Sequence, residues 1–342
     1  MKVYQFPDRT IQIENQEFLY FGGTAYLGLA TNKKFQKIIN SNILKWGTSY
    51  GSSRNANIQL IAYEIAEKYL ANFIQAETAI TVSSGSLAGK LVIEQLSEEN
   101  VTFFHLPNHH NAIQTPKSSP VWLDNKLNAK LLDDKKERIV ILTDAVPTGT
   151  IQPIDLAFID LISKQKEITL VIDESHSFGI IGENGCGLYS QITSKSIKNK
   201  IMISSLGKGL GLTGGVIAGN NDFINKIQNL GNFASAAGMN PAFAISIPEA
   251  KSIYTEQLTK LKENLKYIDK HLNKNALVDF IADYPIIYPK NNNAFDVLKS
   301  NKIIITNFKY PNEAGFLNRI IITANHQKKD LKKLISVLNN IK

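Results

Sequence analysis

One lysine lies within a run of five glycines in the segment SSLGKGLGLTGG, residues 204–215. The lysine is Lys208, and the glycines leave little side-chain bulk around its amine. Three kinds of site are built in this way: a phosphate-binding loop, a dinucleotide-binding loop, and a lysine that must reach a bound molecule. The rest of the sequence distinguishes between these three.

The first two kinds of site do not fit the residues around Lys208. A Walker loop, G-x-x-x-x-G-K-[ST], needs a glycine where Met202 stands, and a serine or threonine where Gly209 stands. A G-x-G-x-x-G spacing does begin at Gly209, but residues 214–220 that follow it favour a strand rather than the required helix. An NAD-dependent oxidoreductase therefore stays only as the outside alternative.

Polar residues follow several short apolar runs, each at the point where a strand is predicted to end. In parallel sheets ligands bind beyond the carboxyl ends of the strands, so these residues are expected to meet at one edge. The groups concerned are residues 83–86, His109 with His110, Asp144, Asp173 with His176, and Lys208.

Pyridoxal phosphate (PLP) chemistry would use these residue types together. The lysine amine forms a Schiff base with the cofactor aldehyde, and a carboxylate, here Asp173, keeps the pyridine nitrogen protonated so that the ring accepts electrons. His176 can hydrogen-bond the phenolic oxygen, while SSGSLAGK (83–90) begins a helix whose free N–H groups suit a phosphate, with the Ser205 hydroxyl added. Singly, each residue also fits a structural role, as a strand-end turn, a core histidine or a helix cap.

The elements that must position these residues alternate between strands and helices from about residue 58, which predicts a mostly parallel sheet with helices on both faces. After about residue 240 the pattern changes to a smaller α+β unit. Strands are expected at 78–84, 101–106, 137–145, 168–175, 200–206, 214–220, 302–310 and 319–325, and helices at 58–73, 86–98, 153–166, 241–274 (one long helix or a broken pair) and 328–341.

Three parts of the chain follow from this pattern. A large α/β domain is expected at 45–240 and a small C-terminal α+β domain at 241–342. The segment 1–44 is expected to pack on the small domain or at the seam.

Composition narrows the function classes. The 342 residues carry a net charge of +8, which indicates a solvated surface first and, as the alternative, attraction of anionic small molecules. No lysine stripe is interleaved with aromatic residues, so no nucleic acid is expected. No apolar run could span a membrane, no secretory signal opens the chain, and the single Cys186 suits a reducing cytoplasm. The six histidines show no ligand spacing, so no metal is expected.

Several motifs resemble those of the α-oxoamine synthase family, whose members include 8-amino-7-oxononanoate synthase and 2-amino-3-ketobutyrate CoA ligase. These enzymes have the fold-type-I, aspartate aminotransferase-like fold of PLP-dependent transferases. The segment DESHSFGIIGENGCG (173–187) resembles the family's DEAHSxGxxGxxGxG, and 204–215 resembles its lysine segment. AYLGLATNKKF (25–35), YGSSRNAN (50–57) and RIIITANHQKKDLKKLISVL (319–338) support the resemblance, which covers most of the chain.

The resemblance implies roles for single residues. Lys208 would be the Schiff-base lysine, with Asp173, His176 and a ring-stacking His110 as the other catalytic residues. Arg319 would hold the substrate carboxylate, a task that suits the arginine fork. The cofactor-binding set would be Lys208, Asp173, His176, His110, Gly85, Ser86, Ser205 and Asp144, with Ser235 as a phosphate contact from the neighbouring subunit of a homodimer.

The activity implied is condensation of an amino acid with an acyl-CoA thioester and loss of carbon dioxide. Three features depart from the family pattern. DAVPTGTIQPID (144–155) replaces its FSMDG segment, Tyr63 stands for a histidine, and Ser86 stands for an aromatic residue. A PLP-dependent aminotransferase or lyase on the same fold therefore stays as the alternative, and a non-catalytic relative is disfavoured by the intact site residues.

Overall fold

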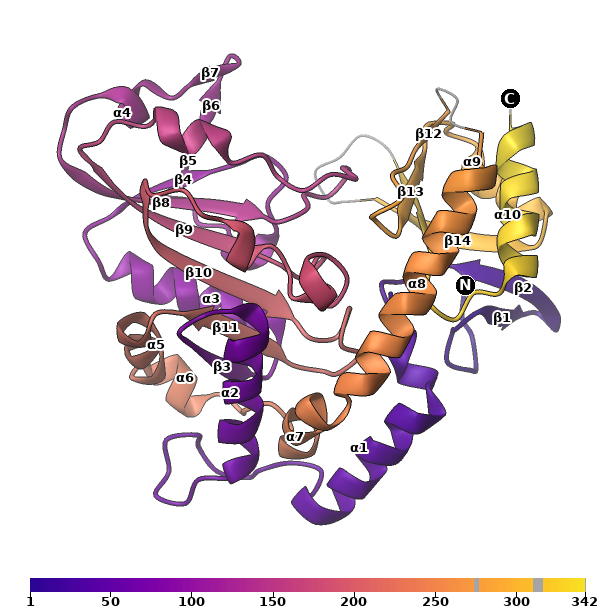
Figure 1. Cartoon of the computed structure of the whole chain (residues 1–342), viewed down its shortest axis with the longest axis horizontal. Coiled ribbons are helices and arrows are strands. Elements are labelled where there is room, and N and C mark those ends of the chain that lie inside the picture. Colours follow the sequence, from indigo (N-terminus) through magenta and orange to yellow (C-terminus); the bar gives the residue numbers. More distant parts are fainter. Residues whose placement is uncertain (274–276, 310–315, 342) are drawn as a thin grey trace. The chain divides into compact units, whose positions relative to one another are not determined.

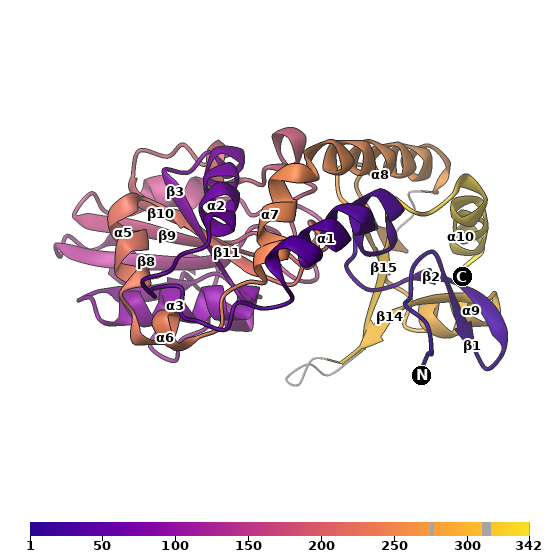
Figure 2. The same ribbon diagram turned by 90° about the horizontal axis from the view of Figure 1, so that it is seen from below.

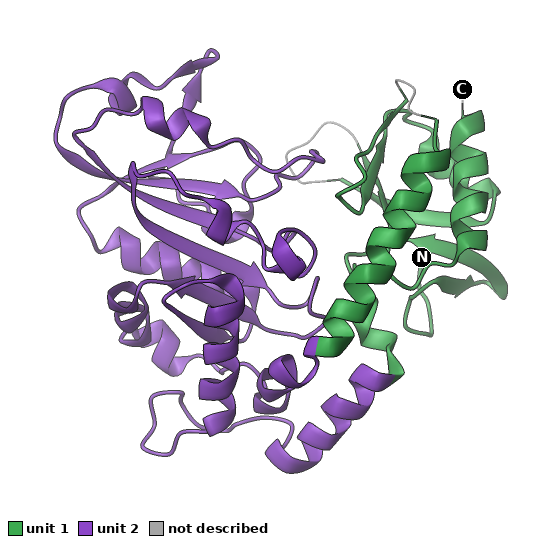
Figure 3. Cartoon of the chain, in the orientation of Figure 1, with its two compact units in different colours: residues 1–33, 252–342 green, residues 34–251 purple. Residues whose placement is uncertain are grey.

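The computed structural model describes residues 1–273, 277–309 and 316–341. The chain divides into two compact units, one of residues 34–251 and one of residues 1–33 with 252–342 (Figure 3). The larger unit extends beyond 45–240 at both ends and includes most of helix α1 (Lys33–Trp46) and all of α7 (Pro241–Glu249), which are hydrogen-bonded to each other. Asn42 Nδ2 of α1 donates to Ser246 Oγ of α7 over 2.9 Å.

The larger unit is built on a seven-stranded sheet in the order β3-β11-β10-β9-β8-β4-β5 (Figure 1). Only β11 runs antiparallel to its neighbours, so the predicted mostly parallel sheet is confirmed. The strands are β3 (Thr78–Val82), β4 (Thr102–His105), β5 (Ser119–Pro120), β8 (Glu137–Asp144), β9 (Lys166–Asp173), β10 (Ile197–Ser205) and β11 (Gly215–Gly219), with β6 (Trp122–Leu123) and β7 (Lys126–Leu127) as a separate hairpin.

Both faces of this sheet are buried, as alternate residues of β8 show. Val140 and Leu142 belong to one apolar cluster and Ile139 and Ile141 to another. Figure 2 shows α3 and α6 on the side of the sheet opposite α2. The remaining helices here are α2 (Ile61–Ile74), α3 (Gly85–Ser97), α4 (Ala129–Leu132), α5 (Asn221–Gln228) and α6 (Gly231–Ser235), with the short 3-10 turns η2 (Asn111–Ile113), η3 (Ala157–Leu161), η4 (Glu183–Gly185) and η5 (Tyr189–Gln191).

The helix expected at 153–166 is wrong. Only the 3-10 turn η3 forms, because Leu156 at its start offers no side-chain cap and Ile162 at its end is already extended. Phe158 and Ile159 of this turn still enter the core, which explains their apolar spacing.

The expected alternative of a broken helix pair at 241–274 is confirmed. Helix α7 carries Pro248, which cannot donate a helical hydrogen bond, and the chain breaks at Ala250 before α8 (Lys251–His271) begins. Lys274 of that expectation and Tyr310 of the strand expected at 302–310 lie outside the described residues.

The smaller unit holds a six-stranded sheet in the order β1-β2-β14-β15-β13-β12. The N-terminal strands belong to it, because β2 pairs in parallel with β14 through Leu19 and Ile303. Its elements are β1 (Thr10–Ile13), β2 (Gln16–Phe21), η1 (Leu29–Thr31), α8, β12 (Val278–Asp279), β13 (Ile286–Pro289), α9 (Ala294–Ser300), β14 (Ile303–Phe308), β15 (Leu317–Ile321) and α10 (Lys328–Asn340). In the part of the chain that the structure describes, every helix is too short or too polar to cross a membrane.

A buried histidine joins β2 to the turn before α10 in this unit. The His326 ring stacks on Phe21 with 4.0 Å between centroids. Its Nδ1 accepts from Thr323 N over 2.9 Å, so Nε2 carries the proton and donates to Tyr20 O over 3.0 Å. Burial lowers the pKa of His326 to about 4, and the ring is neutral in the folded protein.

We therefore predict that the free energy of unfolding falls between pH 7 and pH 5. The unfolded chain protonates this histidine near its ordinary pKa while the fold does not, so the unfolded state binds more protons and about 2 kcal/mol is lost at pH 5. In urea titrations His326→Gln should be less stable at pH 7 but should lose less between the two pH values. The same change at exposed His271 is the control, and an equal pH loss in both variants would contradict the prediction.

Candidate active site

The parallel strands bring their polar carboxyl ends to one edge of the larger sheet. Asp144 ends β8 and lies beside Asp173, which ends β9, in the strand register. Ile203 of β10 pairs with Asp173, so the chain that leads to Lys208 leaves the sheet at the same edge. The sheet thus collects the residues that the sequence separates by more than sixty positions.

Two carboxyl groups and one imidazole form the centre of this edge. Asp173 is buried, its Oδ1 accepts from Ser175 N over 2.8 Å, and its Oδ2 lies 3.8 Å from Nδ1 of His110. Asp144 Oδ1 accepts from the backbone N of His110 over 2.8 Å. The His110 side chain is 46% exposed, so part of its ring stays open to a bound molecule.

The charges at this edge oppose one another. Burial, and then the negative charge of Asp173, raise the pKa of Asp144 well above its usual range. Burial lowers the pKa of His110, and the charges of Lys208 and Lys90 act in the same direction, although Asp173 opposes them. The arrangement therefore favours a protonated Asp144 and a neutral His110.

Lys208 meets His176 directly. Lys208 Nζ lies 2.9 Å from His176 Nε2, and both side chains are half-buried. The loops that carry them pack backbone to backbone, because a Cβ on Gly209 would lie 2.1 Å from the Phe178 carbonyl oxygen. A Cβ on Gly179 would likewise lie 3.0 Å from the Gly209 Cα.

The predicted phosphate turn begins helix α3 beside the end of β10. Ser84 caps the helix by accepting Leu87 N over 3.1 Å, and Ser86 in the first turn is exposed. Gly85 leaves room for a close approach, because a Cβ there would lie 2.8 Å from the Ser205 Cα. The first N–H groups of a helix have no partner within it, so this end suits an anion.

Two further predicted residues belong to other elements than those described above. Ser235 ends α6, is exposed, and makes none of the hydrogen bonds that join the described residues above. Arg319 belongs to β15 of the smaller unit and is only 7% exposed. Its Nε is buried without a hydrogen-bond partner among the described residues, and its guanidinium lies 5.8 Å from the centre of the Phe308 ring.

Sequence reasoning missed Glu174, which is wholly buried beside Asp173. Its carboxylate accepts the backbone N–H groups of Leu188 and Tyr189, each over 2.7 Å, and it contacts Ser177 Oγ. The sequence shows the glycines of the loop that follows Glu174. It does not indicate that the backbone at the end of this loop binds the Glu174 carboxylate.

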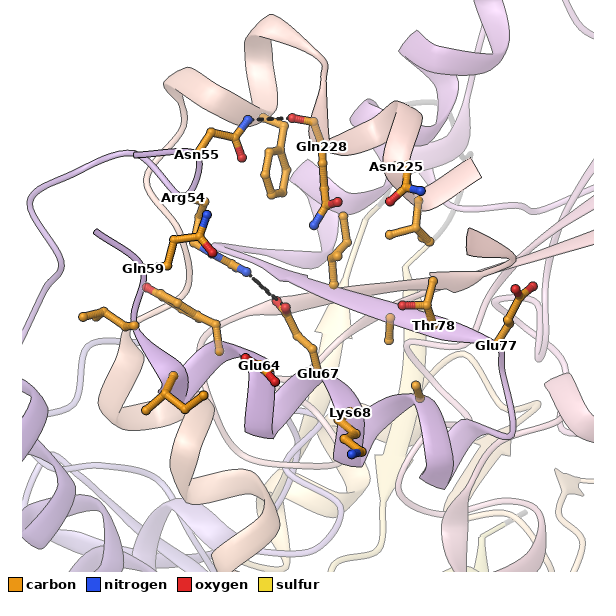
Figure 4. Close-up of a pocket in the computed structure, with 18 of the residues that line it drawn as sticks. Arg54, Asn55, Gln59, Glu64, Glu67, Lys68, Glu77, Thr78, Asn225 and Gln228 are labelled. Atoms are coloured by element: carbon orange, nitrogen blue, oxygen red, sulfur yellow. Dashed lines mark hydrogen bonds and ion pairs between the residues drawn. The ribbon is translucent and has the colours of Figure 1, made fainter. Parts of the chain in front are cut away.

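A hollow in the larger unit also escaped sequence reasoning. Its volume is about 950 Å³, and it lies along α2 and α5 (Figure 4). Arg54 lines this hollow and makes two hydrogen bonds to Glu67, of 2.9 and 3.1 Å. Its guanidinium carbon lies 3.9 Å from the centre of the Tyr63 ring. None of the residues grouped around Lys208 lines this hollow. Among the residues that the structure describes, no cluster of three or more metal-ligating side chains occurs.

The fold is that of solved α-oxoamine synthases. The serine palmitoyltransferase of S. paucimobilis, determined with bound PLP-myriocin, matches with a TM-score of 0.82 at 16% identity, over 99% of this chain and 91% of that one. The 8-amino-7-oxononanoate synthase of Francisella tularensis matches with a TM-score of 0.72 at 21% identity, over 94% and 97%. These matches confirm the predicted fold-type-I class.

A family model for aminotransferase class I and II matches residues 17–338, and the chain belongs to this family. Its cofactor is PLP, as predicted. The 8-amino-7-oxononanoate synthase of Petrotoga mobilis is 28% identical over 97% of this chain and 90% of its own length, and that of Aliivibrio fischeri (strain MJ11) is 24% identical over 99% and 93%. The resemblance to α-oxoamine synthases is thereby confirmed.

The residues at the sheet edge fit this cofactor. A lysine amine, a buried carboxylate, an imidazole with an open face and a helix N-terminus match an aldehyde, a pyridine nitrogen, an aromatic ring and a phosphate.

The contact between the two glycine loops gives a testable consequence. Gly209→Ala should lower the free energy of unfolding by about 1–3 kcal/mol, because the new methyl group would overlap the Phe178 carbonyl. Gly207→Ala is the matched control on the other side of Lys208, since its nearest atom, Ser205 Oγ, lies 3.6 Å away. Equal stability of the two variants in urea titrations would show that the loops do not pack as described.

Proposed function

We propose that this protein is a cytoplasmic, homodimeric PLP-dependent acyltransferase of the α-oxoamine synthase type. It condenses an amino acid with an acyl-CoA thioester and releases carbon dioxide, as the resemblance to the α-oxoamine synthases implies. The observation that carries the proposal is the group of Lys208, His176, Asp173 and His110 at one sheet edge. The relatives at 24–28% identity support the reaction type and leave the substrates to experiment.

Each of these residues would hold the cofactor or act on the substrate. Lys208 Nζ would hold the cofactor at its aldehyde and would take the α-proton of the amino acid. Asp173 would hold the ring nitrogen, and His176 would donate to the phenolic oxygen. His110 would lie against the ring, and Asp144 holds the backbone of His110 by accepting its N–H. When bound, the cofactor would supply an electron sink for the reaction.

The anionic groups of cofactor and substrate have their own partners. Gly85 and Ser86 at the start of α3, with the Ser205 hydroxyl, bind the phosphate. Arg319 binds the substrate carboxylate, because a buried guanidinium that lacks an acidic partner among the described residues needs a negative charge. We assign the exposed Ser235 to the phosphate of the other subunit in the homodimer.

A second function is favoured by one segment. Residues 145–154 form a short loop closed by a hydrogen bond from Ile154 N to Ala145 O over 2.9 Å, and they lack the family's FSMDG motif. A PLP-dependent aminotransferase or lyase would not need that motif.

We predict that the PLP-loaded protein releases CoA thiol only when an amino acid and an acyl-CoA are both present. Glycine, alanine, serine and threonine would each be offered with a short and a long acyl-CoA, and thiol would be followed by a colour reagent. Lys208→Ala should abolish release, because it removes the amine that is proposed to hold the cofactor and to take the α-proton. If no pair releases thiol while an amino acid still changes the cofactor absorbance, transamination or lyase chemistry is the function instead.

Arg319→Gln should weaken amino acid binding about 10- to 100-fold, since a charge-assisted hydrogen bond to a carboxylate contributes about 1.5–3 kcal/mol. Binding would be followed by titrating the cofactor absorbance with amino acid. PLP affinity should not change. Arg138→Gln, at a partly exposed arginine of β8, is the control, and an unchanged dissociation constant in Arg319→Gln would remove this residue from the substrate site.

A further inference from the structure

Glu174 closes the loop that carries His176. This loop, residues 175–187, follows β9, and Leu188 and Tyr189 come directly after it, before β10 begins at Ile197. Both of those residues donate their backbone N–H groups to the same oxygen, Oε1 of Glu174, over 2.7 Å. The side chain at the start of the loop thus holds the backbone at its end.

The backbone of Glu174 is tied on two further sides. Its N–H donates to Ile203 O of β10 over 2.8 Å, and its carbonyl accepts from Ser177 N at 2.9 Å and Phe178 N at 2.8 Å. One residue therefore connects β9, the strand that leads to Lys208, and both ends of the loop.

The Glu174 carboxylate packs tightly against the backbone at Gly187, where no larger residue would fit. A Cβ on Gly187 would lie 2.6 Å from Oε2 of Glu174, and Gly187 has a φ of +88°. The loop also folds onto itself, with Gly179 N donating to Gly185 O over 2.7 Å. The backbone of this loop at Phe178 and Gly179 contacts Gly209.

We propose that Glu174 is a positioning residue that fixes loop 175–187, and through it the contact between His176 and Lys208 around the cofactor. The inference rests on the roles proposed for Lys208 and His176. It does not depend on which substrates the enzyme uses.

We call the contacts of the Glu174 carboxylate with Leu188, Tyr189 and Ser177 the clamp. Their chemistry explains which replacement of Glu174 should preserve them. The three partners of the carboxylate, two amides and the Ser177 hydroxyl, are neutral donors. Burial, with Asp173 close by, raises the pKa of Glu174 to about 7. A glutamine keeps the oxygen that accepts both amides, and its NH₂ can donate to Ser177 Oγ, whose own proton can go to the Glu174 carbonyl oxygen 3.2 Å away. An alanine leaves two buried N–H groups without acceptors.

The experiment compares Glu174→Ala and Glu174→Gln with wild type in the PLP-loaded full chain, by hydrogen–deuterium exchange and by visible circular dichroism of the bound cofactor. In Glu174→Ala, the peptide that contains Leu188 and Tyr189 should exchange at least about tenfold faster, and PLP should bind about tenfold more weakly. The dichroic band of the cofactor should shrink. Glu174→Gln should restore all three readouts to within about threefold of wild type. Glu183→Ala, an exposed glutamate of the same loop, is the control.

Three results would overturn the inference. Unchanged exchange at Leu188 and Tyr189 in Glu174→Ala would show that the clamp does not hold the loop. Faster exchange spread evenly over the larger unit, with unchanged cofactor dichroism, would assign Glu174 to general stability alone. Failure of glutamine to restore the readouts would show that the oxygen acceptor is not what matters. If Glu174→Ala does not fold, Glu174→Asp, whose carboxylate is one methylene shorter, takes its place. None of these readouts needs an acyl-CoA, so a failed acyltransferase assay leaves them interpretable.

Discussion

The candidate site depends on one steric constraint, which is that two loops from different strands must touch through their backbones. Gly209 lies against the Phe178 carbonyl with no space for even a methyl group, and Gly179 faces it from the other loop. With the loops in this contact, Lys208 Nζ lies 2.9 Å from His176 Nε2. Gly209 and Gly179 therefore bring the loop of the lysine and the loop of the histidine together.

Electrostatics imposes a second constraint at the same edge. Parallel pairing places Asp144 and Asp173 side by side, and burial makes two adjacent carboxylates costly. The cost falls if one of them is protonated, and the direction of the Asp144 pKa selects that residue. Asp144 can accept the backbone N–H of His110 whether its carboxyl group is charged or protonated.

Much of this arrangement could be predicted from the sequence, because the reactive residues follow apolar runs whose direction in a parallel sheet is fixed. That rule placed Asp144, Asp173 and the lysine segment at one edge. A different rule, apolar spacing, failed at 153–166, where the spacing suited a helix but the ends offered neither a cap nor a continuing turn. Neither rule could distinguish Glu174 from a surface acid, since burial of a loop residue is decided by the backbone that returns onto it, fourteen positions later.

The burial of Arg319 could not be predicted from the sequence either. Its place in the substrate site came from a resemblance, and sequence alone could not separate it from an arginine at the surface of a strand. The smaller unit buries it in β15, with its Nε lacking a hydrogen-bond partner among the described residues. Burying a guanidinium nitrogen without a hydrogen-bond partner is unfavourable. The carboxylate proposed above as the ligand of Arg319 would supply a negative charge beside it, and both candidate reactions use a substrate with such a group.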